Sequence, residues 1–369
     1  MNLFARQIGE RIRLAREDKK ITQDIFAAQF GCNDRQTVSA IETGLRLVKP
    51  EELTRISKIL GEPLSFFTDP YVVTEKRAFS YRAKPDSKDI TAFEQKAHKL
   101  ISANRRFRQL LQEPATTFGN QLRDINKQSS LNSATACGER TARAIGLGEV
   151  PALNLRDTIE KKLNVMVLFV EAPESISGAA CHLSDGDFIM INRNEASFRR
   201  NFDLGHELFH ILTWAEMPPE RIDAIQKGES RPKAEKLADA FTAGLLMPSE
   251  MLRVRWSRRN PAEDIHDWIL QNARDFRVSG KALFWRLVNA QIISRQDAES
   301  VNRDRLSRND DCEPDGKPNA YNAEFARRVN VVLQKGLVSA RKTADLLEFD
   351  LAEVIGFLAA YKYPAPFAL

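Results

Sequence analysis

Two histidines and a glutamate stand at a spacing that suits metal-dependent hydrolysis, in the pentapeptide His206-Glu207-Leu208-Phe209-His210. Residues four apart share one face of an α-helix, with Cβ atoms roughly 5–6 Å apart. Both imidazoles can therefore reach one zinc ion at about 2.0–2.1 Å. Glu207 projects beside them, where it can accept a proton from water. The pattern predicts a helix that carries two zinc ligands and a general base.

A catalytic zinc takes a third protein ligand and keeps one position open. The best candidate is Glu235, which stands four residues before Asp239 on one face of a predicted helix. Glu235 is expected to bind the metal, while Asp239 holds the free N–H of a ligand histidine. Asp239 itself and Glu229 are the alternative ligands. A zinc site without turnover, structural or sensory, is the alternative to catalysis.

The three other histidines are weaker candidates. His182 lies in a predicted strand just before the zinc helix, and one reading gives it a role in polarising the substrate carbonyl in the transition state. The other reading is a solvent or core histidine. His98 and His266 stand among charged residues, so both are expected at the surface.

Short apolar runs and helical spacing predict the elements that must position this chemistry. A turn signal, Ser184-Asp185-Gly186-Asp187, predicts a hairpin between two strands. The expected strands are 165–170, 179–183 and 188–191, and the expected helices are 155–163, 199–214 and 233–246. This is a compact α+β pattern that begins near Ser133.

The segment from Arg199 to His210, with Lys233 to Pro248 ending in Gly-Leu-Leu-Met-Pro, resembles the ImmA/IrrE family of metallopeptidases. The resemblance covers roughly residues 135 to 300. It implies that His206, His210 and Glu235 bind zinc and that Glu207 is the general base.

The sequence departs from that family at three positions. Phe209 stands where the family usually has glycine, and it is expected to narrow the substrate cleft. Asp203 replaces a small residue or threonine, and Leu237 replaces a common acidic residue.

The first 68 residues predict short helices. Thr22 can cap the second helix, which ends at Gly31, and Asn33 and Asp34 can cap the third. The run Thr22-Gln23, Gly31 and then Gln36-Thr37-Val38-Ser39-Ala40-Ile41-Glu42-x-Gly44 resembles the XRE/Cro family of helix-turn-helix domains, over about residues 5 to 68.

Val38 and Ile41 anchor the third helix, which leaves other side chains near its start for the major groove of DNA. The expected contacts to double-stranded operator DNA are Gln23, Arg35, Gln36, Thr37 and Ser39. A helical protein-interaction module is the alternative.

Residues 69–88 are polar and predict a linker, and a long helix is expected from Asp89 to Gln112. Its apolar residues recur at alternating spacings of four and three, and Asn104 occupies the remaining core position of that series. Two readings stay open, a coiled-coil seam whose register the Asn sets and a helix packed on its own chain. Residues 115–135 predict a loop. The tail predicts helices at 322–334, 339–347 and 351–361, the last two resembling a second helix-turn-helix that packs or dimerises.

Bulk properties are compatible with this organisation. The chain has 369 residues, a net charge of +5 and a mildly basic pI near 9.0, which permits a nucleic-acid partner. Its four cysteines include no C-x-x-C pair, which excludes a zinc-finger type of site and fits a reducing compartment. No apolar stretch is long enough to cross a membrane. A cytoplasmic location with no membrane partner is expected.

The sequence therefore predicts a mainly α fold with a small α+β zincin-like domain. The expected order is a five-helix helix-turn-helix domain (1–68), a linker with a long helix (69–132), a zinc metallopeptidase domain (133–300) and a helical, helix-turn-helix-like C-terminal region (301–369). The expected function is a DNA-binding transcription regulator, as a homodimer, whose zinc endopeptidase cleaves a repressor- or antitoxin-like protein. The alternative is a regulator or antitoxin whose zincin domain is a non-catalytic zinc sensor or a partner-binding scaffold.

Overall fold

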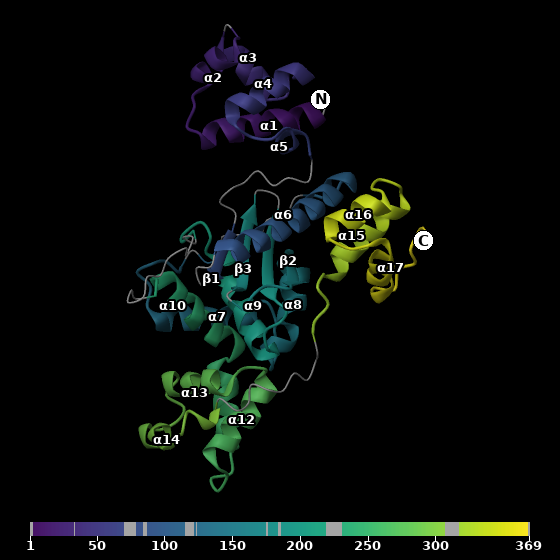
Figure 1. The fold of residues 1–369 in the computed structure, drawn as a ribbon. Coiled ribbons are helices and arrows are strands. Elements are labelled where there is room, and N and C mark those ends of the chain that lie inside the picture. Colours follow the sequence, from purple (N-terminus) through teal and green to yellow (C-terminus); the bar gives the residue numbers. More distant parts are fainter. Residues whose placement is uncertain are drawn as a thin grey trace. The chain divides into compact units, whose positions relative to one another are not determined.

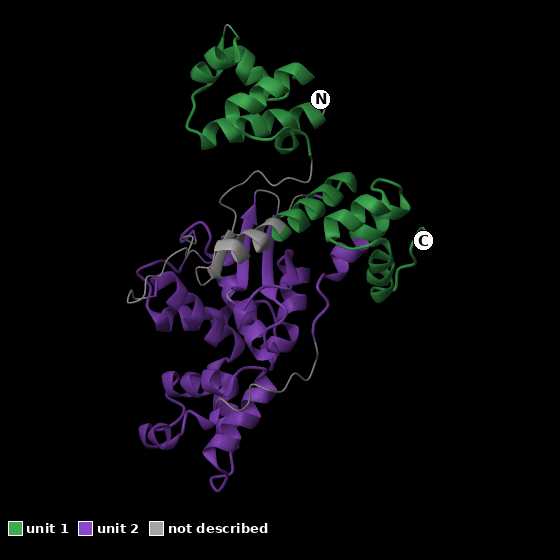
Figure 2. Ribbon diagram, in the orientation of Figure 1, with its two compact units in different colours: residues 1–77, 95–113, 328–369 green, residues 78–94, 114–327 purple. Residues whose placement is uncertain are grey.

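The structure is a computed structural model of the whole chain. It describes residues 3–32, 34–69, 79–83, 87–114, 122, 124–174, 176–183, 186–218, 231–306 and 317–367. The chain divides into two compact units (Figure 2). The first comprises residues 1–77, 95–113 and 328–369, and the second comprises residues 78–94 and 114–327.

The N-terminal part of the first unit is a cluster of five helices with its own apolar core, as predicted. Thr22 caps the second helix through its side chain, Asp34 caps the third, and Gly31 ends the second helix in the left-handed conformation (φ 79°) that glycine adopts without strain. The helices are α1 (Leu3–Asp18), α2 (Gln23–Phe30), α3 (Arg35–Glu42), α4 (Pro50–Leu60) and α5 (Leu64–Thr68).

The remainder of the first unit contains the end of α6 (Ser87–Leu110) and three C-terminal helices, of which α15 begins in the second unit. Asn104 of α6 is buried, and its Oδ1 accepts a hydrogen bond from Nη1 of Arg328 in α15 at 3.2 Å. The buried Asn thus has a partner within its own chain, which favours the reading of α6 as a helix packed on that chain. The C-terminal helices are α15 (Ala323–Gln334), α16 (Ala340–Leu347) and α17 (Leu351–Ala360).

The second unit is built on a four-stranded sheet of order β1-β3-β4-β2. β3 (Ile176–Leu183) and β4 (Gly186–Asn192) are antiparallel, as the hairpin signal predicts, and β2 (Val165–Val170) is parallel to β4. Ser184 and Asp185 of the turn lie outside the described residues. β2 and β4 are buried along their whole length, which explains their continuous apolar runs.

The first strand corrects the prediction of a linker over residues 69–88. Phe79–Ala83 forms β1 at the edge of the sheet, antiparallel to β3, with a register shift between Tyr81 and Ala83. A five-residue edge strand is stabilised by pairing with a distant strand, so its local sequence carries little signal.

In the described part of the chain, eight helices, α7 to α14, lie wholly in the second unit. Figure 1 shows α8 and α9 beside the strands of the sheet, where α8 contacts β2. α9 lies between the sheet and α10, since it contacts β3 and β4 on one side and α10 on the other. The helices are α7 (Leu131–Ala144), α8 (Pro151–Lys162), α9 (Ser197–Leu212), α10 (Lys233–Leu246), α11 (Ser249–Ser257), α12 (Ile265–Phe276), α13 (Gly280–Asn289) and α14 (Arg295–Ser300).

α7 and α10 approach so closely that each needs a glycine at the contact. A Cβ on Gly138 of α7 would lie 2.0 Å from the carbonyl oxygen of Phe241 in α10. In the other direction, a Cβ on Gly244 of α10 would lie 2.1 Å from the carbonyl oxygen of Thr135 in α7. Backbone packs on backbone at both points, so the position of α10 is set by α7.

Within the described residues, no helix is both long enough and apolar enough to cross a membrane.

Candidate metal centre

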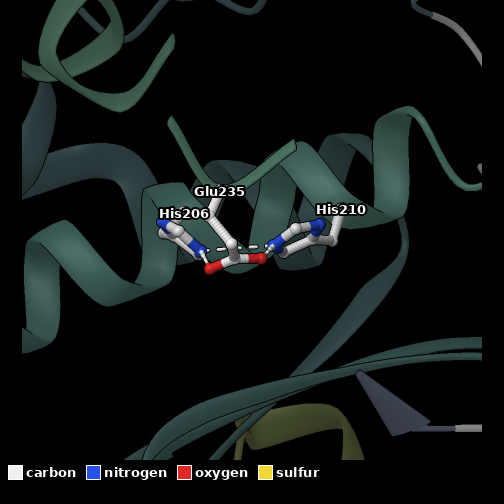
Figure 3. Close-up of side chains that lie close together, drawn as sticks. All are labelled: His206, His210 and Glu235. Atoms are coloured by element: carbon white, nitrogen blue, oxygen red, sulfur yellow. Dashed lines mark hydrogen bonds and ion pairs between the residues drawn. The ribbon is translucent and has the colours of Figure 1, made fainter. Parts of the chain in front are cut away.

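Three side chains converge between α9 and α10 in the core of the second unit (Figure 3). The Nε2 atoms of His206 and His210 lie 3.2 Å apart. Each also lies 3.2 Å from one oxygen of Glu235, His206 from Oε2 and His210 from Oε1. All three residues are between 1% and 4% exposed. The four-residue spacing on α9 and the start of α10 thus bring together the histidines and the glutamate that the sequence singled out.

The spacing of these atoms fits a zinc ion. Tetrahedral bonds of about 2.0–2.1 Å place two ligand atoms roughly 3.4 Å apart, and the three facing contacts measure 3.2 Å. His206, His210 and Glu235 are the one group of metal-ligating side chains found among the described residues. Two imidazoles and a carboxylate are a donor set that catalytic zinc sites use.

Asp239 and Arg231 each form a hydrogen bond with a member of this group, and they form an ion pair with each other. Nδ1 of His206 donates to Oδ1 of Asp239 at 3.0 Å, which leaves Nε2 facing Glu235 and His210. Arg231 forms an ion pair with Asp239 and a longer one with Oε2 of Glu235, at 3.5 Å. Arg231 was missed from the sequence, where its spacing of four from Glu235 and eight from Asp239 was the available signal.

Two opposing effects act on the pKa values of His206 and Glu235: burial, and hydrogen bonds to neighbouring ionisable side chains. Burial lowers the pKa of His206, but the carboxylates of Asp239 and Glu235 outweigh it and raise that pKa to about 10. Burial lowers the pKa of His210. Burial raises the pKa of Glu235, but hydrogen bonds from both imidazoles bring it well below its usual range. The carboxylate is therefore ionised and available as a ligand.

Glu207 lies on the same helix, between the two histidines in sequence, and is 2% exposed. It packs against β3, because a Cβ on Gly178 would lie 3.2 Å from Cγ of Glu207. Glycine at this point of the strand leaves room for the glutamate side chain. A carboxylate is thus held beside the three candidate metal ligands without being one of them.

The other predicted residues take different positions. His182 is not part of the three-residue group; its Nδ1 lies 2.5 Å from Oδ1 of Asp187, and its ring lies 5.6 Å from that of Trp214. The alternative ligand Glu229 lies outside the described residues. The surface position expected for His266 is wrong: it is 7% exposed, and its Nε2 accepts from the backbone N–H of Asn302 at 2.7 Å. Of its charged neighbours in sequence, Asp264 lies 3.2 Å from Nδ1 of the His266 ring, and Asp267 is exposed. His98 is half-buried.

The expectation that Phe209 narrows a cleft is also wrong. Phe209 is fully buried, and its ring packs on that of Phe241 in α10 at 5.3 Å. It points into the core because α9 is buried on most of its circumference. A large residue at this position therefore fills the interface between α9 and α10, the two helices that carry the candidate metal ligands.

The predicted DNA-contacting residues gather around the start of α3. Arg35 and Gln36 are exposed in its first turn, and Thr37 and Ser39 are half-exposed. Gln23 is fixed between two partners, since its Nε2 donates to Glu42 at 2.7 Å and its Oε1 accepts from Nε of Arg35 at 2.9 Å. In a helix-turn-helix motif, residues near the N-terminus of the second helix of the motif contact base edges in the major groove. In this domain α2 and α3 form the motif, so α3 is that helix.

Fold and site together define the class: a helix-turn-helix protein that also carries a metallopeptidase-type domain with a possible His/His/Glu metal site. Residues 160–287 match the family model of the IrrE N-terminal-like domain, and residues 12–67 match the helix-turn-helix family model. No curated protein was found to match the chain. The chain is thus a fusion of an XRE-type helix-turn-helix with a domain of the ImmA/IrrE-like metallopeptidase family, which confirms the two resemblances drawn from the sequence.

Proposed function

We propose that this protein is a DNA-binding transcription regulator whose metallopeptidase-family domain is a zinc-dependent endopeptidase. The observation that carries the proposal is the convergence of His206, His210 and Glu235 on one point, with Glu207 beside it on the same buried helix. The substrate class we infer is a repressor- or antitoxin-like protein, in line with the family that the domain resembles.

His206, His210 and Glu235 would hold the ion, and Asp239 would keep the ring of His206 in the orientation that presents Nε2. Zinc bound there would polarise the scissile carbonyl and lower the pKa of a water molecule. Glu207 is the group that would take the proton from the attacking water and pass it to the leaving amine. Its packing against Gly178 supports this role, because a general base must be held in one position.

The proposed DNA partner is a double-stranded operator, contacted by Gln23, Arg35, Gln36, Thr37 and Ser39. Arginine suits guanine and glutamine suits adenine in the major groove. If the protein binds as a homodimer, the operator is an inverted repeat with half-sites about 10–10.5 base pairs apart, or a multiple of that spacing.

One pair of variants tests the proposal against a zinc sensor without turnover. Glu207→Gln keeps size and hydrogen bonding but cannot accept a proton, so it should retain metal and fold. If the domain is a peptidase, this variant should lose at least the roughly 10²–10⁴-fold that positioned proton transfer contributes. His210→Ala should lose the metal, and with it both the cleavage of protein substrates and the regulation that depends on cleavage.

The readout is one reporter assay of regulation together with cleavage of co-expressed candidate proteins. Equal and severe loss in Glu207→Gln and His210→Ala is the expected result. Regulation that survives in Glu207→Gln but fails in His210→Ala would overturn catalysis and assign the domain to metal sensing or partner binding.

A further inference from the structure

The strand β3 contacts the proposed general base on its face and the strand β1 along its edge. Glu207 of α9 packs on Gly178 of β3, since a Cβ on that glycine would lie 3.2 Å from Cγ of Glu207. β1 pairs with residues of β3 on both sides of Gly178, from Ile176 to Cys181 (Figure 1). The edge of β3 that β1 covers therefore runs past the residue on which Glu207 packs.

β1 comes from outside the part of the chain that matches the metallopeptidase family. The match to the IrrE N-terminal-like domain covers residues 160–287, and the helix-turn-helix match ends at residue 67. β1 occupies residues 79–83, so it belongs to the segment that connects the two matched domains. Without β1, β3 would be the outer strand of the sheet in the described part of the chain, with a row of unpaired backbone N–H and C=O groups.

The pairing between β1 and β3 is short and irregular. Tyr81 lies opposite Ala179, but Ala83 lies opposite Ile176, so two steps along β1 match three steps along β3. The irregularity falls beside Gly178, the residue that contacts the proposed general base. Such irregularities disrupt the ladder of hydrogen bonds locally. A five-residue strand with a disrupted ladder is one that another extended segment can replace.

We propose that β1 is a built-in competitor of the substrate: it occupies the edge of β3 to which an extended segment of the substrate protein adds as a strand. The inference rests on the proposed function and names the form in which the substrate is recognised. One edge offers a single row of donors and acceptors, so β1 and a substrate segment exclude each other. Main-chain hydrogen bonds supply the affinity in this mode of recognition, and they suit any extended segment without proline at the pairing positions.

The first test is the binding of a fluorescent peptide to the full-length protein, measured by anisotropy. The probe has the sequence of residues 77–85, Arg-Ala-Phe-Ser-Tyr-Arg-Ala-Lys-Pro, with blocked ends. The parent protein carries Glu207→Gln, so that the peptide stays intact. The same peptide with proline in place of its serine and tyrosine is the control probe, because it lacks two N–H donors, and it should not bind.

A pair of variants weakens β1 or leaves it in place. N–H groups of successive residues point to opposite sides of a strand, so Ser80→Pro/Tyr81→Pro removes at least one donor to β3. This variant should bind the peptide at least about tenfold more tightly than the parent. Ser80→Thr/Tyr81→Val is the matched control, because it keeps both N–H groups and both new side chains favour strands. It should bind like the parent.

A reversible lock gives the opposite test. Phe79 lies directly opposite Cys181 in the ladder. Opposite residues of an antiparallel pair have Cα atoms about 4.5–5.5 Å apart, which a disulfide can bridge. Oxidised glutathione should therefore convert the introduced thiol of Phe79→Cys and Cys181 into a disulfide, with release of two reduced glutathiones. The locked protein should bind no peptide at a concentration that half-saturates the reduced protein. The parent, treated in the same way, controls for the other cysteines.

Four results would each overturn the proposal. They are the failure of the peptide to bind any variant at millimolar concentration, equal affinity in the proline variant and the parent, absence of the disulfide by mass spectrometry, and equal binding to the locked and reduced proteins. Zinc affinity, measured by competition with a chelator, reports the folding of the second unit. A proline variant that loses this affinity has unfolded, and the lock then decides.

The proposal and the proposed function fail in different ways. With Glu207 intact, the proline variant should cleave a co-expressed substrate faster, and the locked protein should not cleave it. If the peptide binds the edge while regulation survives in Glu207→Gln, the surface stands and catalysis is rejected, so that the occupant is a partner protein. If cleavage occurs but is unchanged by the proline variant and by the lock, catalysis stands and β1 is not a competitor.

Discussion

Asp239 and His206 form the hydrogen bond that orients the candidate metal centre: Nδ1 of the ring donates to Oδ1 at 3.0 Å. The other nitrogen of the ring then faces Glu235 and His210. Carboxylates that fix a ligand histidine in this way typically change metal affinity 10–100-fold when they are removed. Glu235 and Asp239 are both acidic residues of α10, yet only Glu235 reaches both imidazoles.

The two acids should therefore differ in their effect on zinc affinity. Glu235→Ala removes a proposed ligand and should weaken zinc binding more than Asp239→Ala, for which we expect a loss of about 10–100-fold. Competition with a chelator measures both affinities. Glu250→Ala, an acid on α11 outside the group, should leave them unchanged. The reverse order of the first two variants would assign the third ligand to Asp239.

The wild-type protein should contain about one zinc ion per chain. The variant His206→Ala/His210→Ala should contain almost none, because both nitrogen ligands are gone. Metal analysis after dialysis is the measurement. His98→Ala provides the control, since that histidine is outside the described metal group. A double variant with full zinc content would refute the ligand assignment.

Gln36→Ala should relax base preference at one operator position, by roughly 1–3 kcal/mol. The side chain is exposed in the first turn of α3, the position from which base edges are read. Selection from a random DNA pool, followed by sequencing, measures the preference. Lys58→Ala, exposed on α4, should leave the preference intact. A footprint that persists after deletion of residues 1–68 would show that this domain does not bind the operator.

Glu42→Ala should destabilise the helix-turn-helix domain by about 3–5 kcal/mol. Glu42 accepts two hydrogen bonds from Arg16, at 2.6 and 3.1 Å, and both side chains are buried. Removal of Glu42 leaves the buried guanidinium with the exposed Glu17, at 3.3 Å, as its remaining ion-pair partner. Hydrogen exchange of α1–α4 in the full chain measures the loss. Glu10→Ala, exposed on α1, should change protection by less than about 0.5 kcal/mol. An equal effect of both variants would contradict a specific role for the pair.

Elements with a strong local signal were predicted well. The bounds of α10 and β2 match the prediction residue for residue, since an apolar run or helical spacing marks each of them and Pro248 follows α10 closely. The metal group was predicted for the same reason: two of its members are four apart on one helix, and the third lies in a segment with its own acidic spacing.

Features that depend on distant contacts were not predicted. β1 exists because β3 pairs with it, and nothing in its own five residues requires a strand. Phe209 was expected at a cleft because its spacing within α9 does not reveal that α10 covers that face. The burial of His266 likewise depends on the segment around Asn302, 36 residues further along the chain.

The backbone contact between α7 and α10 makes the candidate metal centre a product of tertiary folding. His206 and His210 become neighbours as soon as α9 coils, but Glu235 joins them only when α10 is docked, and Gly138 and Gly244 fix that docking. A nascent or partly unfolded chain can offer two nitrogen ligands, and the complete set exists only in the native domain. An ion that binds only the native state adds its binding free energy to the free energy of folding. An abundant supply of the ion would therefore stabilise the second unit against unfolding. A scarcity of the ion would leave this unit more often unfolded and so more exposed to proteolysis.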